Sequence, residues 1–448
     1  MFRSRKITIA AVVLLTILTL AAMSEAVQSL ARLAVEPLKI FTDALVIVHE
    51  KYVEQVNVRD LIYGALEGML SGLDPHSSFM RPDVLKDISS DMQGKFGGLG
   101  IEITKKDNYI MVISPIDDTP ATAAGIKPGD YIVKINGVST RSMPITEAVQ
   151  KLRGPAGTTV KIHVWRKSWM EPKEMELTRA NIEVKTVKHN IPEKGYGYVK
   201  ITQFNANTAD LLGSSLKDLE KMDGGMKGLV LDLRNNPGGL LDQAVRVSNM
   251  FIDSGLIVFT RGRNESQNTA ARAVKAGSHT GFPMVLLINA GSASASEIVA
   301  GCLQDHHRAI IAGERSFGKG SVQTIIPLSD GSGLKLTTAK YFTPNGRDIQ
   351  AHGIDPDFVV PGDLLAGLDE NRRKLLTREQ DLERHLQGPE DLQEELPSDT
   401  PGDLPGDVEK KKTDSPQDPQ LDAALRILKA WPAFSKAAGT STPPAENN

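Results

Sequence analysis

The sequence has 448 residues, enough for about three domains of ordinary size. Hydrophobic residues make up 40% and charged residues 24%, so the chain has the material for a folded core. A net charge of −3, an aromatic content of 5% and the lack of a basic stripe argue against nucleic-acid binding. The single cysteine, Cys302, excludes an intrachain disulfide and any zinc site built from cysteines.

The amino-terminal segment is typical of an exported protein. Arg3, Arg5 and Lys6 precede an uncharged apolar run over residues 7–23. A positive region followed by such a run predicts an export signal, and its length lies between those of a cleaved signal peptide and a membrane-spanning helix. We expect residues 1–26 to be a signal peptide or an inner-membrane anchor, which places the protein in the periplasm or cell envelope.

An N-terminal helical segment is expected over residues 27–85. Apolar residues recur at spacings of three and four between residues 37 and 72, which indicates amphipathic helices. The helical pattern stops in the stretch LDPHSSFM, residues 73–80, where Asp74-Pro75 breaks it. We interpret His76 in this stretch as a structural residue.

A β-rich domain is expected over residues 86–170. Short β-branched runs alternate there with turns such as Pro128-Gly129, a strand is expected at 158–165 and a helix at 145–152. In the stretch KFGGLGIEI, consecutive backbone N–H groups can form an anion-binding nest, and the strand after it can pair with an extended peptide. The residues concerned are Gly97, Gly98, Leu99, Gly100 and Ile101.

Apolar strands and amphipathic helices alternate over residues 171–365, which predicts an α/β sheet core. The expected strands are 196–202, 228–234 and 284–289, and the expected helices are near 207–222, at 240–252 and after Ser294. The region 366–448 is helical at first, then rich in proline and acidic residues. The stretch from Leu386 to Gln420 lacks the apolar surface to fold, and a short amphipathic helix follows at 418–431.

Ser294 lies where the strand at 284–289 passes through the small residues of GSASASEI into a helix. Such a turn exposes a side chain beside the first free N–H groups of the helix. Ser294 to Glu297 also matches a helix capping box, so this serine alone would be interpreted as a cap. A catalytic role requires a general base, because a serine hydroxyl is a poor nucleophile at neutral pH.

Lys319 is the candidate base, 25 residues beyond Ser294 in the stretch FGKGSVQ. No acid is adjacent to it in sequence, and burial would lower its pKa enough to let it accept a proton. Gln323 lies four residues further on and is expected to share a face with Lys319 and to orient its amine.

Two other patterns lead elsewhere. Ser316 and Lys319 form an S-x-x-K string like that of penicillin-binding proteins, but no K-T-G box follows it. His306 and His307 lack a metal-ligand spacing and are expected at the surface near a helix end. No metal or organic cofactor is expected.

The stretches GSASASEI, FGKGSVQ and LDLRNNPGG together resemble the carboxy-terminal processing peptidases, also called tail-specific proteases. The resemblance implies a Ser-Lys dyad of Ser294 and Lys319, supported by Gln323. It also implies an oxyanion hole made by the backbone N–H of Ala295 and by that of Gly239 or Gly238, with Gly239 slightly favoured.

The β-rich domain resembles a PDZ domain, in which residues 97–101 would bind the carboxylate of a substrate tail. The stretch LRGPAGT also matches the family, and its Arg153 is counted among the candidate substrate-binding residues. Arg153 either extends toward the catalytic domain or, as we favour, lies on the solvated surface. The expected activity is that of an exported serine endopeptidase acting on proteins with exposed apolar C-termini. The protein is expected to form a homodimer and to bind an adaptor or activator protein. The alternative is an inactive PDZ-bearing scaffold that captures C-termini for another protease.

Overall fold

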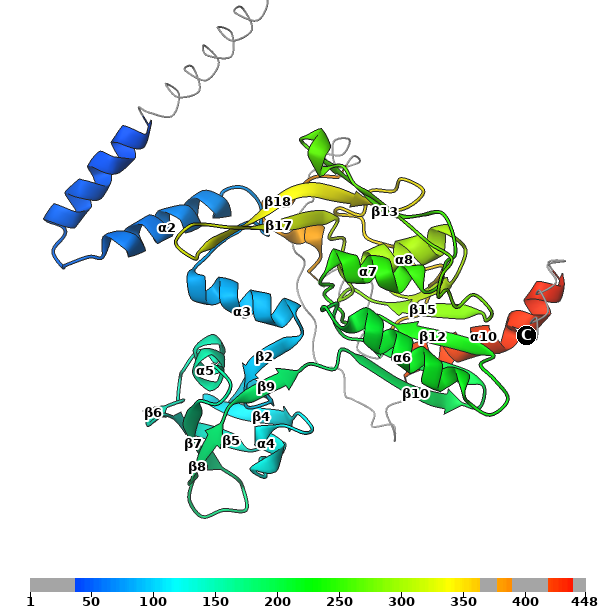
Figure 1. Ribbon diagram of the computed structural model, residues 1–448, viewed down its shortest axis with the longest axis horizontal. Coiled ribbons are helices and arrows are strands. Elements are labelled where there is room, and N and C mark those ends of the chain that lie inside the picture. The colour runs from blue at the N-terminus through cyan, green and yellow to red at the C-terminus, as the bar shows by residue number, and fades with distance from the viewer. Residues whose placement is uncertain (1–36, 363–376, 389–417, 438–448) are drawn as a thin grey trace, which may run out of the picture. The chain divides into compact units, whose positions relative to one another are not determined.

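A computed structural model describes residues 37–362, 377–388 and 418–437 (Figure 1). The chain divides into two compact units, one ending at Leu73 and the other beginning at Asp74. In the first unit, residues 37–51 are helical and helix α2 spans Val58–Ser71, so the expected N-terminal helices form. Asn57 caps α2, because its side-chain oxygen accepts a hydrogen bond from the backbone N–H of Arg59 at 2.9 Å.

The predicted export segment, residues 1–26, lies outside the described residues. Within the described part of the chain, no helix has the length and apolar character needed to cross a bilayer.

The second unit is built around a six-stranded sheet in the order β10-β11-β12-β15-β16-β19. Its neighbouring strands run parallel except for the antiparallel pair β10 and β11. The strands are β10 Val187–Glu193, β11 Tyr196–Ile201, β12 Gly228–Asp232, β15 Met284–Ile288, β16 Ile310–Gly313 and β19 Phe358–Val359.

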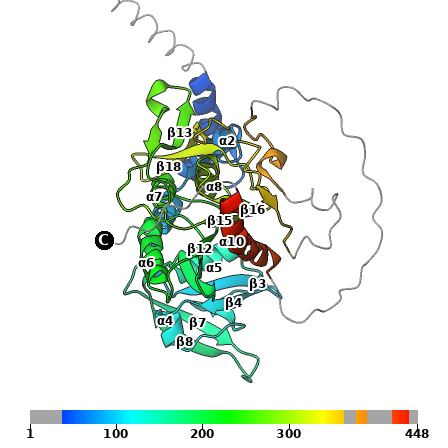
Figure 2. The same cartoon turned by 90° about the vertical axis from the view of Figure 1, so that its right-hand side faces the viewer.

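Helices cover both faces of this sheet, which explains why β12 and β15 are apolar at every position but the last of β12. Alternate residues of a strand face opposite sides: Leu229 packs in the cluster formed with α6, α7 and α8, whereas Val230 packs against α10. Figure 2 shows α10 on the opposite side of β12 and β15 from α6 and α7. The helices are α6 Thr208–Glu220, α7 Leu241–Asn249, α8 Ala295–Asp305 and α10 Pro419–Ala437.

A second, antiparallel sheet of five strands lies in the same unit (Figure 1). The strand β18 pairs with β1, β13 and β17, and β13 also pairs with β14. This sheet matters for the site because Lys319 directly precedes β17. The elements are β1 Ser78–Met80, β13 Leu256–Gly262, β14 Ala270–Arg272, β17 Ser321–Pro327 and β18 Gly333–Phe342, with short 3-10 turns at Glu265–Gln267 and Glu379–Asp381.

The expected β-rich domain has a sheet of its own in the order β3-β4-β5-β7-β8, with β6 beside β5. Its core is separate from that of the α/β part and includes Ile110, Ile132 and Ile162. A two-stranded ribbon of β2 and β9 joins the entering and leaving chains. The elements are α3 Pro82–Met92, β2 Lys95–Gly98, β3 Ile101–Lys106, β4 Tyr109–Pro115, α4 Pro120–Ala123, β5 Tyr131–Ile135, β6 Val138–Ser139, α5 Ile145–Leu152, β7 Thr159–Trp165, β8 Lys173–Thr178 and β9 Ala180–Glu183.

The predicted architecture is therefore confirmed: an α/β core with an inserted β-rich domain and N-terminal helices. The expected helix at 145–152 has the predicted bounds. The C-terminal helix runs on to Ala437, past the predicted end at 431. Most of the proline-rich and acidic stretch that precedes the C-terminal helix, residues 389–417, lies outside the described residues.

Candidate active site

Ser294 occupies a strained turn between a buried strand and a buried helix. The strand β15 ends at Ile288, α8 begins at Ala295, and Ser294 is the N-cap residue with φ 54° and ψ −111°. A positive φ is uncommon for a residue with a side chain, and such strain is concentrated at functional sites. Only 9% of Ser294 is exposed.

The three alternating serines of GSASASEI have different roles. Ser292 donates its hydroxyl to the carbonyl of Leu233 at 2.8 Å, and Ser296 donates to the carbonyl of Asn236 at 2.9 Å. Both therefore fasten the α8 turn to the turn after β12. Within the described part of the chain, the Ser294 hydroxyl donates to no backbone carbonyl and instead interacts with the phenol of Tyr341. Of the three hydroxyls, only that of Ser294 donates to no backbone carbonyl among the described residues.

Glu297 links the serine turn to the lysine loop. Its Oε2 accepts hydrogen bonds from the backbone N–H of Ser294 at 2.7 Å and of Lys319 at 2.9 Å. Its Oε1 accepts from the hydroxyl of Ser316 at 2.6 Å and from the N–H of Gly318 at 2.7 Å. Burial raises the pKa of Glu297 to about 7, and the four hydrogen bonds act in the opposite direction. The carboxylate that caps α8 therefore also holds the lysine loop, and Ser316 of the S-x-x-K string is one of its hydrogen-bond donors.

Lys319 lies in the loop between β16 and β17 and is half-buried. Its amine forms no salt bridge with any described residue. Burial lowers the pKa of Lys319, and the positive charge of Lys335 lowers it further. The carboxylates of Glu379, Glu297 and Asp74 oppose this shift without removing it. Burial without a bound counter-ion is what a lysine needs to act as a base near neutral pH.

Gln323 lies in β17, and within the described residues no hydrogen bond links it to Lys319. Its Nε2 donates to the hydroxyl of Ser321 at 2.9 Å and to that of Thr337 at 3.4 Å. Lys319 precedes this strand and a register shift separates Val322 from Gln323, so Lys319 and Gln323 do not share a face by regular alternation along one strand. Within the described residues, Ser294 and Lys319 also form no direct side-chain hydrogen bond.

The turn after β12 places two glycines beside the serine. A Cβ on Gly238 would lie 2.9 Å from the backbone nitrogen of Ala295, so the two backbones are in close contact. The N–H of Gly238 donates to the side-chain oxygen of Asn236 at 2.9 Å. The residues on either side of Gly239 pair with Phe204. The N–H of Phe204 donates to the carbonyl of Gly238 at 2.9 Å, and the carbonyl of Phe204 accepts from the N–H of Leu240 at 2.8 Å. This ladder does not use the N–H of Gly239.

The stretch LDPHSSFM supports the second sheet behind Lys319, a function that sequence reasoning assigned only as structural. Asp74 accepts hydrogen bonds from the backbone and hydroxyl of Ser77 at 2.9 and 2.6 Å and from the hydroxyl of Thr337 at 3.1 Å. Burial acts against the charged form of Asp74, but these bonds hold its pKa below its ordinary value. The spacing of Asp74 and Ser77 in the sequence was the signal that could have indicated their hydrogen bonds.

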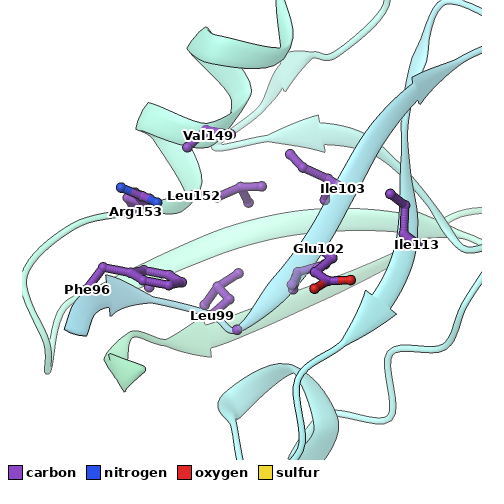
Figure 3. A pocket seen from close by; sticks show the side chains of 11 residues that line it. Phe96, Leu99, Glu102, Ile103, Ile113, Val149, Leu152 and Arg153 are labelled. Atoms are coloured by element: carbon purple, nitrogen blue, oxygen red, sulfur yellow. The ribbon is translucent and has the colours of Figure 1, made fainter. Parts of the chain in front are cut away.

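The β-rich domain has a cavity of about 380 Å³ between α5 and β3. The strand β3 is at the edge of its sheet, so one side of it is open for pairing. Figure 3 shows Phe96 and Arg153 at one end of the pocket and Ile113 at the other. The lining is mainly apolar and consists of Phe96, Gly98, Leu99, Gly100, Ile101, Glu102, Ile103, Ile113, Val149, Leu152 and Arg153.

The predicted carboxylate nest is only partly present as a free loop. Gly97 and Gly98 belong to β2 and pair with β9. The carbonyls of Leu99 and Gly100 accept hydrogen bonds from Ala121 and Ile116 at 2.9 and 2.8 Å. Among the described residues, the N–H groups of Leu99 and Gly100 donate to no backbone carbonyl in these turns.

Arg153, expected among the substrate-binding residues, lines the groove, and its side chain is 25% exposed. Its guanidinium forms a salt bridge with Asp91 of α3 at 2.9 Å and lies 4.5 Å from the centre of the Phe96 ring. This residue therefore joins the groove to the helix that leads into the domain.

An α/β core with a serine at a strand-to-helix turn, joined to a domain with a peptide-sized groove, is the architecture of a peptidase. Three family models match successive parts of the chain. The model for the activating protease CtpB N-terminal domain matches residues 17–84, that for the PDZ domain residues 87–165, and that for peptidase family S41 residues 195–360.

Relatives with known names agree with these matches. A carboxy-terminal-processing protease of Bartonella bacilliformis is 49% identical over 324 residues, covering 71% of this chain and 74% of that protein. Carboxy-terminal processing protease CtpA of Bacillus subtilis is 38% identical over 310 residues, covering 69% and 66%. The solved photosystem II D1 C-terminal processing protease is 33% identical with a TM-score of 0.44, covering 70% of this chain and 85% of that one. The chain belongs to peptidase family S41 and carries a PDZ domain, which confirms the resemblance.

Proposed function

We propose that this chain is an exported serine endopeptidase that cleaves proteins near their C-termini, with Ser294 as nucleophile and Lys319 as general base. The observation that carries the proposal is the Glu297 carboxylate, which accepts the backbone N–H groups of both residues on one oxygen. The strained conformation of Ser294 and the burial of Lys319 support it. Export rests on the apolar segment 7–23.

In this mechanism the Ser294 hydroxyl attacks the scissile carbonyl and its proton passes to the Lys319 amine. The lysine then donates that proton to the leaving amine, and a water molecule hydrolyses the acyl-enzyme. The neutral amine needed for the first step is favoured by burial. No metal or organic cofactor has a role in these steps.

The oxyanion would be held by the backbone N–H groups of Ala295 and Gly239. The Gly238 N–H is already bonded to Asn236, which favours Gly239 for this role. Gly238 lies against Ala295, so both turns meet where the charge would develop.

The substrate tail would bind in the PDZ groove. An extended C-terminus can pair with the open edge of β3, and its carboxylate can accept the N–H groups of Leu99 and Gly100. The last side chain would occupy the apolar cavity, where Ile103 and Leu152 are part of the lining. We therefore propose proteins with exposed apolar C-termini as the substrates.

Activation requires side chains to move, because Ser294 and Lys319 are not hydrogen-bonded and Gln323 is bound to Ser321 and Thr337. We propose that tail binding, or an adaptor or activator protein, produces the engaged arrangement, in which Gln323 orients the lysine amine. Exposed apolar side chains in the first unit, such as Phe41 and Tyr52, are consistent with a homodimer contact.

The test is incubation of the purified protein with a small protein that ends in apolar residues, followed by intact-mass spectrometry. Ser294→Ala and Lys319→Ala should each abolish cleavage, whereas Lys217→Ala, which changes an exposed lysine of α6, should retain it. Replacing the last substrate residue by aspartate should slow cleavage. Full turnover by Lys319→Ala would contradict the dyad, and tail binding without cleavage by the unaltered protein would favour the scaffold alternative.

A further inference from the structure

A short C-terminal segment, residues 377–388, reaches the lysine loop from outside the region that matches the peptidase model, which ends at residue 360. Its residue Glu379 is completely buried. A buried carboxylate is costly unless it is paired, so its partners indicate why it is there.

The Glu379 carboxylate has two side-chain partners. His76 Nε2 lies 2.9 Å from Oε1 and 2.8 Å from Oε2, and the side-chain amide of Gln350 donates to Oε1 at 2.9 Å. The oxygen of the same Gln350 amide accepts the backbone N–H of Gly320 at 3.0 Å. One glutamine therefore connects Glu379 to the residue that follows Lys319.

The backbone around Glu379 holds the same loop. The N–H of Glu379 donates to the carbonyl of Phe317 at 3.2 Å, and the guanidinium of Arg378 donates to the carbonyl of Ser316 at 3.1 Å. The loop 316–320 is thus fastened by Glu297 through its N–H groups and by this segment through its carbonyls and Gly320.

We propose that Glu379 is a positioning residue for the reaction, which holds the loop of Lys319 in place and acts on the lysine amine through its negative charge. His76, which sequence reasoning assigned only as structural, keeps this carboxylate ionised. The inference rests on the proposed role of Lys319 as the general base.

The charges around the two groups support this assignment. Burial acts against the charged form of Glu379, but the hydrogen bonds from His76 and Gln350 hold its pKa below the ordinary value, and the charge of Lys319 contributes. The charges that act on Lys319 are those of Lys335, Glu379, Glu297 and Asp74. Of the three carboxylates, Glu379 has the largest effect on the pKa of Lys319. Removal of the Glu379 charge therefore favours the neutral amine at a lower pH.

The experiment compares Glu379→Gln with Glu383→Gln in the full chain, because Glu383 is an exposed acid of the same segment. The readout is kcat and KM on a peptide substrate across pH. We expect Glu379→Gln to move the acid limb of kcat/KM toward lower pH by roughly half a unit to one unit. Its kcat on the plateau should fall about tenfold through the loosened loop, with KM little changed. Glu383→Gln should match the unaltered protein.

Two further variants separate charge from position. Gln350→Leu removes the connection to Gly320 but keeps the charge, so kcat should fall while the limb stays in place. Glu379→Asp also keeps the charge, which provides the comparison if Glu379→Gln does not fold. An acid limb that is identical in all folded variants, or a Glu379→Gln enzyme with normal kcat, would overturn the inference. If Lys319→Ala itself retained activity, the proposed function would fail first, and the two failures are distinguishable.

Discussion

Ser294 and Lys319, 25 residues apart in sequence, donate their backbone N–H groups to the same carboxylate oxygen of Glu297, at 2.7 and 2.9 Å. One buried side chain therefore sets the distance between the backbone of the proposed nucleophile and that of the proposed base. The two backbones are held by this shared acceptor, although no hydrogen bond joins the two side chains within the described residues.

Glu297→Gln should reduce both stability and activity. The new amide group would replace one oxygen that now accepts two hydrogen bonds, so two buried donors would face another donor. We expect a loss of about 3 kcal/mol in the free energy of unfolding, from the cost of unsatisfied buried polar groups. Cleavage should fall at least as steeply, because the serine turn and the lysine loop would no longer share an acceptor. Urea unfolding and steady-state kinetics measure the two effects.

Glu265→Gln is the matched control for this change, because Glu265 is an exposed acid in a short helical turn. It should leave both quantities unchanged within about 0.5 kcal/mol. A Glu297→Gln protein that unfolds like the control would show that the four hydrogen bonds contribute little.

The pH dependence of cleavage should follow the neutral form of Lys319. Burial lowers the pKa of Lys319 below its ordinary value of 10.5, and the base must be unprotonated. We therefore expect kcat/KM to rise with pH along a limb whose midpoint lies below 10.5. A limb at or above that value would contradict a buried lysine base.

The same lysine should affect stability in a defined direction. Because the folded pKa of Lys319 is lower than the unfolded one, the unfolded chain binds more protons between the two values. The free energy of unfolding should therefore rise with pH in that window. Lys319→Met should remove this contribution, so the difference in unfolding free energy between the two proteins, measured by urea at several pH values, should be largest at the acid side. A difference that is independent of pH would rule out the shift.

The sequence predicted those features that depend on local pattern. The helix at 145–152, the buried strands and the serine turn all follow from periodicity and from the small residues of GSASASEI. Contacts between distant segments have no such pattern. The spacing of residues does not show that the Glu297 carboxylate accepts the backbone N–H of Lys319, or that the N–H of Glu379 donates to the carbonyl of Phe317. Nor does it show that a register shift before Gln323 breaks the alternation with Lys319.

Gly239→Ala should disable the proposed oxyanion site. Gly239 has φ +144°, and an added Cβ would lie 2.0 Å from the carbonyl oxygen of Phe204, so the turn must move. We expect kcat to fall by about 10²-fold through the misplaced N–H group, with a smaller change in KM. The control is Gly281→Ala, where a Cβ would have no atom within 4 Å and the backbone is not left-handed. Normal kcat in Gly239→Ala would exclude this glycine from the oxyanion site.

Leu428→Ala should test whether α10 belongs to the folded core. Leu428 is 1% exposed and packs with Val230 and Leu287 on the face of the sheet opposite α8. Arg234 fixes the start of this helix, because its guanidinium binds Asp418 at 2.7 Å as well as Asp232. Loss of the buried side chain should lower the free energy of unfolding by about 2–4 kcal/mol.

The control for that change is Arg426→Ala, two residues earlier and exposed, which should be neutral. Because α10 covers β12 and β15, the strands that lead into the glycine turn and the serine turn, Leu428→Ala should also lose cleavage activity on heating before the control does. Equal urea midpoints for the two variants would mean that α10 adds nothing to the stability of the core. A lower midpoint for Leu428→Ala alone would place this C-terminal helix among the elements that hold the proposed catalytic turns.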